Sequence, residues 1–311
     1  MIREERVGER AFYVVPGGLP DPYRGRVEET YADSAELWQR AIGTDLWFQF
    51  GVYGSDGPSE RSLDDAGRAY FEEQLGLAGV SPNSAPMDRI LDIGFGWGTA
   101  LEHLARMFPA CRRLDGVNIS GAQVHYAARR IAELGLSDRV RLYLCNAQDI
   151  GELPDADQPY DLVISRGSIT HFSYDVLEST MRALVPRVRP GGTVVISESL
   201  YNVPLNTYAS AVADEADRLA CGHRKTPGYL TEVLDRHGLM VRDLRELPSS
   251  GEVIRWLDEV RTNIGGLAPE QVTKALDELR VTCESWGAAL RTDKASVFSV
   301  IARRSAGGGQ A

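Results

Sequence analysis

A glycine-rich segment between a predicted strand and a predicted helix constrains the fold of this chain more than any other feature of its sequence. The apolar residues 90–93 lead directly into glycines at positions 94, 96 and 98, and residues 99–108 have the apolar spacing of a helix. Glycines at alternate positions let the backbone turn tightly and leave room for a ligand beside it. The following helix presents free backbone N–H groups at its start. This order predicts the first half of a βαβ unit.

Strands and helices continue to alternate along the chain. Helical segments are also predicted before the first strand, within residues 29–77. The pattern predicts an α/β fold, a Rossmann-like three-layer sandwich with a mainly parallel seven-stranded sheet and helical lid or cap additions. The remaining strands are expected at residues 113–117, 140–145, 160–165, 192–198, 239–244 and 296–302, and the later helices at residues 122–134, 176–188, 227–237 and 253–290.

We expect four regions. Residues 1–80 form an N-terminal arm and a helical cap, and the first 28 of them are predicted to be loop because they are charged and rich in turns. Residues 81–200 form the Rossmann-like core that carries the glycine-rich turn. Residues 201–303 complete the sheet and add helical insertions, and the glycine-rich residues 304–311 are predicted to be a disordered tail.

Composition narrows the class of protein. The formal net charge is −10, which lacks the basic footprint of a nucleic-acid-binding protein, so we expect no nucleic-acid partner. The cysteines lie far apart and no ligand-spaced histidines accompany them, which predicts neither a metal site nor disulfides. No apolar run approaches the roughly 18 residues that span a bilayer, and the N-terminus lacks a signal sequence. We expect no membrane contact and a cytoplasmic location. The sequence does not decide between a monomer and a homo-oligomer.

The first motif resembles that of class I S-adenosylmethionine-dependent methyltransferases, an acidic residue followed by Gly-x-Gly-x-Gly. Asp92 stands two places before Gly94, and Gly96 and Gly98 complete the pattern. The resemblance implies that Asp92 orients the loop and the methionine amino group of the cofactor, although an aspartate that only caps the turn would look the same. An NAD-binding oxidoreductase is the weaker alternative, because its third glycine comes one place later and its ribose ligand is acidic.

Residues 115–123 resemble the second motif of a subgroup that includes tocopherol, sarcosine, prenyl-diphosphate and cyclopropane-forming enzymes. Asn118 stands where many relatives have an acidic ribose ligand, and the subgroup often has a glutamine five places later, matched by Gln123. An amide carbonyl accepts hydrogen bonds from hydroxyls, though less strongly than a carboxylate. We expect Asn118, Ser120 and Gln123 to bind the cofactor; Asn118 and Ser120 can also cap the next helix.

A third motif is expected at residues 146–147. Asn146 and Ala147 stand where the family commonly has Asp-Ala in contact with adenine. The side-chain carbonyl of Asn146 can accept the adenine N–H in place of the usual acid, and the Ala147 backbone amide can donate to the ring. An ordinary turn between strand and loop explains this segment equally well.

Residues 161–172 resemble the fourth motif, at the carboxyl end of a central strand, where open α/β sheets bind ligands. His171 is therefore expected near the methyl-transfer site, either as a general base or as a packing and hydrogen-bonding residue. Arg166 is predicted to contact the cofactor or an anionic acceptor, with a solvated or ion-paired arginine as the alternative. Several prenyl-type enzymes have a glutamate where Gly167 stands, and this chain lacks it.

An aromatic segment, residues 46–53, resembles the part of the subgroup that lies against the cofactor, with Gln49 in place of the usual histidine. We expect Trp47 and Tyr53 to contact the cofactor as part of an apolar lid that excludes water. Plain core packing is an equally good interpretation. Further aromatic residues fall where the family builds its acceptor pocket, namely Tyr201, Tyr208, Trp256 and Trp286.

The resemblance implies a function. It predicts S-adenosyl-L-methionine as the cofactor, no metal, and in-line transfer of a methyl group to a small, largely apolar, secondary-metabolite-like acceptor. It also implies that the last strand is antiparallel. Two alternatives keep the same fold: an enzyme that binds this cofactor and catalyses cyclisation or rearrangement, and a non-catalytic scaffold.

Overall fold

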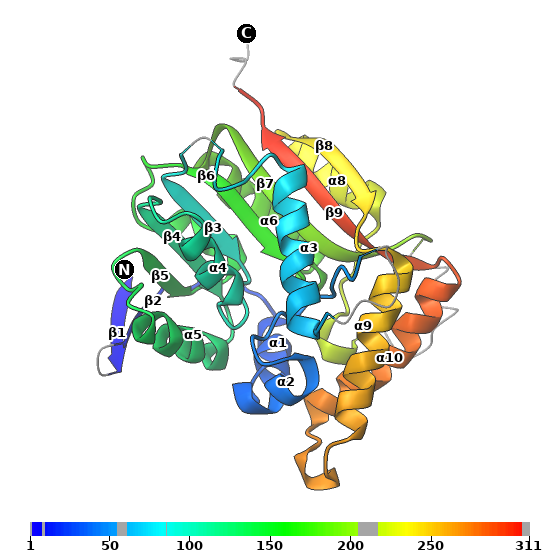
Figure 1. The fold of residues 1–311 in the computed structure, drawn as a ribbon. Coiled ribbons are helices and arrows are strands. Elements are labelled where there is room, and N and C mark those ends of the chain that lie inside the picture. The colour runs from blue at the N-terminus through cyan, green and yellow to red at the C-terminus, as the bar shows by residue number, and fades with distance from the viewer. Residues whose placement is uncertain (1, 8–9, 55–60, 85, 205–216, 307–311) are drawn as a thin grey trace.

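A nine-stranded sheet runs through the described part of the chain, residues 2–7, 10–54, 61–84, 86–204 and 217–306 of the computed structural model (Figure 1). The strand order is β1-β2-β5-β4-β3-β6-β7-β9-β8. Tyr208 and the end of the predicted tail lie outside the described residues. The strands are β1 (Arg3–Val7), β2 (Arg10–Val14), β3 (Arg89–Ile93), β4 (Arg113–Asn118), β5 (Val140–Leu144), β6 (Tyr160–Arg166), β7 (Val188–Tyr201), β8 (Leu239–Glu246) and β9 (Ala295–Arg304).

The centre of the sheet is parallel, as predicted. Strands β5, β4, β3, β6 and β7 pair in parallel, whereas β9 pairs antiparallel with both β7 and β8. The predicted antiparallel last strand is therefore confirmed. The four neighbours β4, β3, β6 and β7 are buried along most of their length, and β3 and β6 each carry the short apolar run expected of a strand that is covered on both faces.

The predicted number of seven strands is too small, because the N-terminal segment adds a hairpin to the sheet. Strand β2 pairs in parallel with β5, Tyr13 opposite Tyr143, and β1 pairs antiparallel with β2. Phe12 is buried against the helices on one face. The charged residues of this segment suggested a loop, but an edge strand tolerates charges on its solvent side, so they do not exclude a strand.

Three groups of helices surround the sheet. The first group, α3, α4 and α5, covers one face, and the second, α6 and α8, covers the opposite face. The third group, α1, α2, α9 and α10, forms a separate apolar cluster and lies together below the sheet in Figure 1. The helices are α1 (Arg24–Thr30), α2 (Ala35–Ile42), α3 (Leu63–Leu77), α4 (Thr99–Met107), α5 (Gly121–Glu133), α6 (Tyr174–Leu184), α8 (Pro227–Arg236), α9 (Ser250–Gly265) and α10 (Lys274–Arg291).

Capping residues set several helix ends. Ser62 accepts a hydrogen bond from the Asp65 backbone N–H at the start of α3, as its position predicts. Ser249 and Glu252 form a capping box on α9. The helix predicted over 253–290 is in fact two antiparallel-packed helices, α9 and α10, since the backbone leaves the helix at Gly266.

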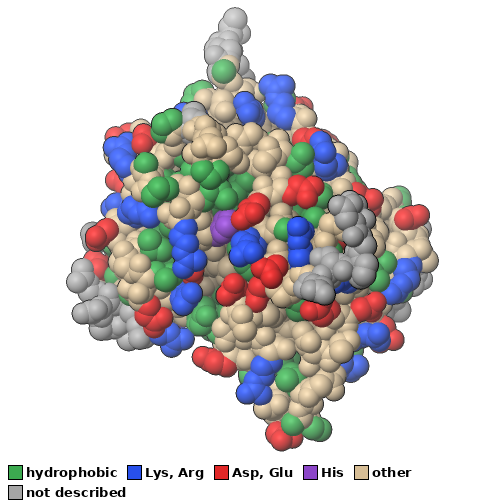
Figure 2. Space-filling model, in the orientation of Figure 1, with side chains coloured by type: hydrophobic (Ala, Val, Ile, Leu, Met, Phe, Trp, Pro, Cys, Tyr) green, Lys and Arg blue, Asp and Glu red, His purple; other side chains and the backbone are tan. Residues whose placement is uncertain are grey.

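The surface is mixed in charge. On the face drawn in Figure 2, acidic and basic side chains of the described residues are interspersed. Among the described helices, none combines the length and the apolar character needed to cross a bilayer.

Candidate active site

A deep pocket opens at the carboxyl ends of β3, β4, β5 and β6, between the sheet and the helices α1, α9 and α10. It brings together most of the residues predicted from sequence. The predicted residues that line it are Trp47, Asp92, Gly94, Gly96, Asn118, Gln123, Asn146, Ala147, Arg166 and His171. Ser120 and Tyr53 are buried but do not line it.

The glycine-rich turn closes one side of the pocket. Gly94 has φ of +74°, and a Cβ there would lie 2.6 Å from Cβ of Ser168. Gly96 has φ of +57°, and its Cβ position meets nothing within 4 Å. Both residues therefore need the left-handed conformation that favours glycine, and a side chain at Gly96 would project into open space beside the turn.

Asp92 and Arg166 are a pair of opposite charges without direct contact. Asp92 is 2% exposed, and its Oδ2 accepts no hydrogen bond from the described residues. Burial raises the pKa of Asp92 to about 7, and the nearby Arg166 opposes this rise. An unpartnered buried carboxyl is costly, so a ligand with a cationic donor fits this position.

Arg166 lies in an aromatic box. Its guanidinium carbon is 5.7 Å from the ring centroid of Trp47, 5.1 Å from that of Tyr70 and 4.9 Å from that of Phe71. Burial lowers the pKa of Arg166, and Tyr70 and Asp92 oppose this. The rings stabilise the cation without neutralising it, which leaves its charge available to an anionic group in the pocket.

Asn118 and Gln123 form a hydrogen-bonded pair. The Asn118 Nδ2 donates to Oε1 of Gln123 over 2.9 Å and to the Gly96 carbonyl over 3.2 Å. Ser120 accepts a hydrogen bond from the Gln123 backbone N–H and so caps α5, while its own N–H donates to Oδ1 of Asn118. The amide pair is therefore fixed at the pocket wall, and Ser120 is the residue that fixes it.

The loop after β5 carries the predicted adenine site. Asn146 caps a short 3₁₀ turn, η1 (Ala147–Glu152), by accepting from the Gln148 backbone N–H over 3.2 Å. Its Nδ2 donates to Oδ2 of Asp21 over 2.7 Å. Asp21 also lines the pocket, and sequence reasoning missed it because nothing local marks this Asp-Pro turn as a ligand.

His171 is held by hydrogen bonds at both ring nitrogens. Nδ1 lies 2.8 Å from the carbonyl oxygen of Ala220, and Nε2 lies 3.2 Å from the hydroxyl oxygen of Tyr31. A carbonyl can only accept, so the assignment from these partners puts the proton on Nδ1 and makes Nε2 the acceptor. Burial lowers the pKa of His171 to about 4, and the positive charges of Arg224 and Lys225 contribute. The imidazole is therefore neutral near pH 7.

Two buried charges support the loop of His171: Glu198, which sequence reasoning missed, and Lys225, which is buried although its basic cluster at residues 223–225 suggests a solvated turn. Glu198, 1% exposed at the pocket wall, accepts from the backbone N–H of Thr170 over 3.1 Å, and burial raises its pKa to about 7. Lys225 is 0% exposed and donates to the carbonyls of Ile169, Phe172 and His223. Burial lowers its pKa to about 7. A charged residue within the buried second half of β7, two places after Ile196, was the available signal for Glu198.

The missing glutamate at position 167 has a steric explanation. Gly167 has φ of +62°, and a Cβ there would lie 2.7 Å from Nε2 of Gln49. Gln49 is itself fixed, because its Nε2 donates to the Ser197 carbonyl over 3.1 Å. A glutamate at position 167 would meet both a strained backbone and Gln49.

The far half of the pocket is mostly apolar and aromatic. Trp256 and Trp286 line it as predicted, whereas Tyr201 is buried outside it. Phe48 packs near Trp256, with 6.2 Å between ring centroids, and near Tyr31, with 6.3 Å.

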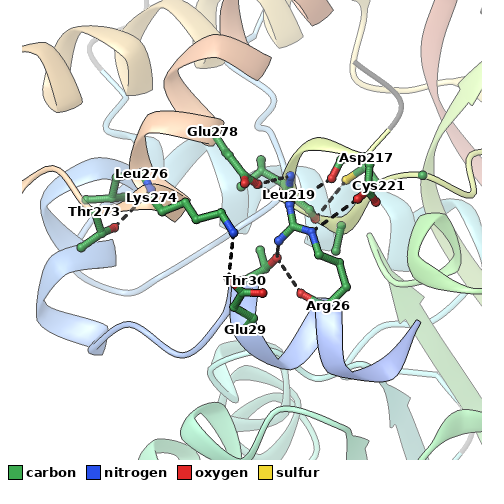
Figure 3. A network of polar contacts seen from close by, with 12 residues as sticks. Arg26, Glu29, Thr30, Asp217, Leu219, Cys221, Thr273, Lys274, Leu276 and Glu278 are labelled. Atoms are coloured by element: carbon green, nitrogen blue, oxygen red, sulfur yellow. Dashed lines mark hydrogen bonds and ion pairs between the residues drawn. The ribbon is translucent and has the colours of Figure 1, made fainter. Parts of the chain in front are cut away.

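A polar network joins α1, α10 and the turn at residues 217–220 beside this half of the pocket (Figure 3). Arg26 of α1 donates to Glu278 of α10 over 2.6 Å and to the Asp217 carbonyl over 3.1 Å. Glu278 in turn accepts from the Leu219 backbone N–H over 2.8 Å. The network thus places the 3₁₀ turn η4 (Arg218–Ala220), which supplies the carbonyl that holds His171.

Sequence comparison finds methyltransferases. Residues 90–192 match the methyltransferase domain family. The chain is 30% identical to methyltransferase GfsG of Streptomyces halstedii over 198 residues, which is 64% of this chain and 66% of that protein. It is 34% identical to geranyl diphosphate 2-C-methyltransferase of Streptomyces coelicolor over 87 residues, 28% of this chain and 27% of that protein. The chain thus spans at most 66% of the length of these curated relatives.

Solved structures share the fold over nearly the whole chain. Cyclopropane synthase MmaA2 from Mycobacterium tuberculosis superposes with a TM-score of 0.78 at 15% identity, covering 93% of this chain and 100% of that one. The [4+2]-cyclase SpnF gives 0.73 at 20% identity, covering 94% and 100%. Geranyl diphosphate C-methyltransferase from Streptomyces coelicolor, in complex with Mg²⁺, a geranyl thiolodiphosphate and S-adenosyl-L-homocysteine, gives 0.64 at 17% identity, covering 91% and 98%.

Proposed function

We propose that this chain is a class I S-adenosylmethionine-dependent methyltransferase and that it transfers a methyl group from S-adenosyl-L-methionine to a small, largely apolar organic acceptor. The observation that carries the proposal is the division of the pocket. One half has the glycine turn, the buried Asp92 with its unpartnered Oδ2, and the Arg166 guanidinium, and the other half is lined by aromatic rings.

The residues present fit the cofactor. The orphaned Oδ2 of Asp92 would accept from the methionine ammonium, and the Arg166 guanidinium would face the carboxylate. Asn118 and Gln123 would bind the ribose hydroxyls, and Asn146 and Ala147 would border the adenine. When bound, S-adenosyl-L-methionine supplies a sulfonium methyl group for in-line displacement. Trp47 stacks on Arg166 and would help to exclude water at this end.

For an acceptor with a hydroxyl or amine, His171 would receive the proton through Tyr31. Nε2 of His171 already accepts from the Tyr31 hydroxyl, so an acceptor meets the phenol oxygen and not the imidazole. As the acceptor heteroatom would bond to the methyl carbon, the bond from that carbon to sulfur would break and leave its electron pair on sulfur; the acceptor proton would pass to Tyr31, whose own proton would pass to Nε2. The carbonyl of Ala220 would then stabilise the imidazolium through Nδ1.

The acceptor half indicates what kind of molecule fits. Trp256, Trp286, Phe48 and Leu279 favour an apolar body, and geranyl diphosphate 2-C-methyltransferase, whose name gives a small isoprenoid acceptor, supports small-molecule biosynthesis, as in secondary metabolism. The net charge of −10 supports an acceptor other than nucleic acid. A cytoplasmic location remains part of this proposal.

The first test is calorimetric titration with S-adenosyl-L-methionine and S-adenosyl-L-homocysteine. We expect saturable binding to the wild type and none to Gly96→Arg, with circular dichroism to show that the variant is folded. A folded wild type that binds neither ligand would refute the proposal. With an acceptor from a subsequent screen, product mass separates methylation from cyclisation, the reaction that the likeness to SpnF makes the second candidate.

A further inference from the structure

The segment before α1 is bound to the loop after β5. The Gly18 backbone N–H donates to Asp149 over 3.1 Å, and Nε2 of Gln148 donates to the Leu19 carbonyl over 3.0 Å. Asn146 completes the contact by donating to Asp21 over 2.7 Å. The arm therefore places a carboxylate on the wall of the pocket beside Asn146 and Ala147.

This arrangement makes Asn146 a weaker acceptor for a ligand than the carboxylate of Asp21, although its Oδ1 keeps one free lone pair. Its Oδ1 already accepts from the Gln148 backbone N–H, and its Nδ2 donates to Asp21. An amino group on a ligand needs an acceptor, and a carboxylate is a stronger one than an amide.

Asp21 retains acceptor capacity. Its Oδ1 accepts from the Tyr23 backbone N–H over 3.1 Å, and its Oδ2 accepts from Asn146. Each carboxylate oxygen has two lone pairs, so both oxygens can accept a further hydrogen bond, while the two existing bonds fix the direction of the carboxylate.

We propose that Asp21 is the residue that reads the exocyclic amino group of the adenine, and that Asn146 serves to hold Asp21 in place. The inference rests on the proposed function, since it assigns a contact within the same cofactor pocket. The carboxylate that would bind the adenine amino group comes from Asp21 in the N-terminal arm. The side-chain amide of Asn146, after the end of β5, holds that carboxylate. Because a carboxylate attracts an amino group and repels a carbonyl oxygen, Asp21 would also reject a purine with an oxygen at that position.

The test compares two ligands that differ only there: S-adenosyl-L-homocysteine and its deaminated analogue, S-inosyl-L-homocysteine. Calorimetry is run on the wild type, Asp21→Asn, Asp21→Ala, the exchange variant Asp21→Asn with Asn146→Asp, and the exposed control Asp157→Asn. We expect the wild type and the control to prefer the adenine ligand by about tenfold or more, the size of one charge-assisted hydrogen bond.

Both single Asp21 variants should lose most of this preference, and the exchange variant should regain part of it, because the acid returns to the other side of the same contact. Unchanged affinity and preference in both single variants would overturn the inference. So would weaker binding of both ligands with the preference intact, which is what a purely structural role of the arm predicts. A folded wild type that binds neither ligand overturns the proposed function as well, so the two failures are distinguishable.

Discussion

The Tyr31 hydroxyl donates to Nε2 of His171 because the other ring nitrogen, Nδ1, is committed to the Ala220 carbonyl. The histidine that the sequence marks as the candidate base is therefore separated from an acceptor by a phenol. Tyr31 follows the end of α1, and His171 ends the short 3₁₀ turn at Ile169–His171 that follows β6, so neither position reveals the other in the sequence.

Removing the hydroxyl group of Tyr31 should slow the reaction without changing the affinity for the cofactor. With a hydroxyl acceptor, we expect Tyr31→Phe to lower kcat about 100-fold, the usual contribution of a positioned acid–base group, with unchanged S-adenosyl-L-homocysteine affinity. His171→Gln should behave alike, and the double variant should be little worse than either single one, because the two act in series. Tyr229→Phe, which packs on Tyr174 away from the pocket, is the control. If the losses in kcat of the two single variants add up in the double variant, Tyr31 and His171 do not act in one proton relay.

Cofactor affinity should depend on pH through Asp92. Burial raises the pKa of this carboxyl to about 7, so it is protonated in the empty pocket at lower pH and cannot pair with an ammonium. Binding needs the ionised form, so affinity should fall as pH decreases from about 8, approaching about tenfold per unit well below pH 7. Calorimetry with S-adenosyl-L-homocysteine measures this. Asp92→Asn should bind more weakly and with a flatter profile, and an equally steep profile in that variant would refute the assignment.

Lys225 should matter to stability far more than an exposed lysine does. Its ammonium donates to three backbone carbonyls and lies near the buried Glu198. Lys225→Met leaves these three carbonyls without their donor and removes a positive charge near Glu198, and we expect a loss of about 3 kcal/mol in the free energy of unfolding. Lys274→Met, which removes an exposed pair with Glu29, should leave the free energy of unfolding nearly unchanged. Denaturant unfolding gives both values, and similar losses would contradict this prediction.

Introducing a side chain at position 167 should cost stability in two separable ways. Gly167→Ala forces a non-glycine residue to φ of +62°, at about 1 kcal/mol, and its Cβ meets Gln49 at 2.7 Å. Combining it with Gln49→Ala should remove the collision but not the strain. Thermal unfolding of the two single variants and the double variant measures the coupling, and strictly additive losses would show that Gln49 does not oppose the new side chain.

The core of the fold and the cofactor half of the site are predictable from sequence because their signals are local. The glycine turn at Gly94 and Gly96 lies within one short segment, and so does the pair of Asn118 and Gln123, five residues apart and hydrogen-bonded. The pattern of strands and helices fixes where these segments meet, since parallel strands bring their carboxyl ends to one edge of the sheet.

The rest was missed because it depends on contacts between distant segments. Asp21 and Asn146 are 125 residues apart, and Tyr31 and His171 are 140 apart. The strands β1 and β2 become strands by pairing with β5, a partner that no pattern within residues 1–28 identifies. Tyr53 and Ser120 do not line the pocket, since Tyr53 packs in the core and Ser120 caps α5, the second role that its position allowed.

The hydrogen bond between Arg26 and Glu278 has a consequence for the order in which parts of the fold assemble during synthesis. A ribosome synthesises α1 early, but the partner that fixes α1 over the pocket emerges some 250 residues later, as the separation of these two residues requires. The glycine turn and the parallel strands can assemble before then. The half of the pocket that is lined by α1 and α10 can close only when α10 has left the ribosome. A nascent chain would therefore pass through a stage in which the glycine turn and the parallel strands are formed but this half of the pocket is still open to solvent.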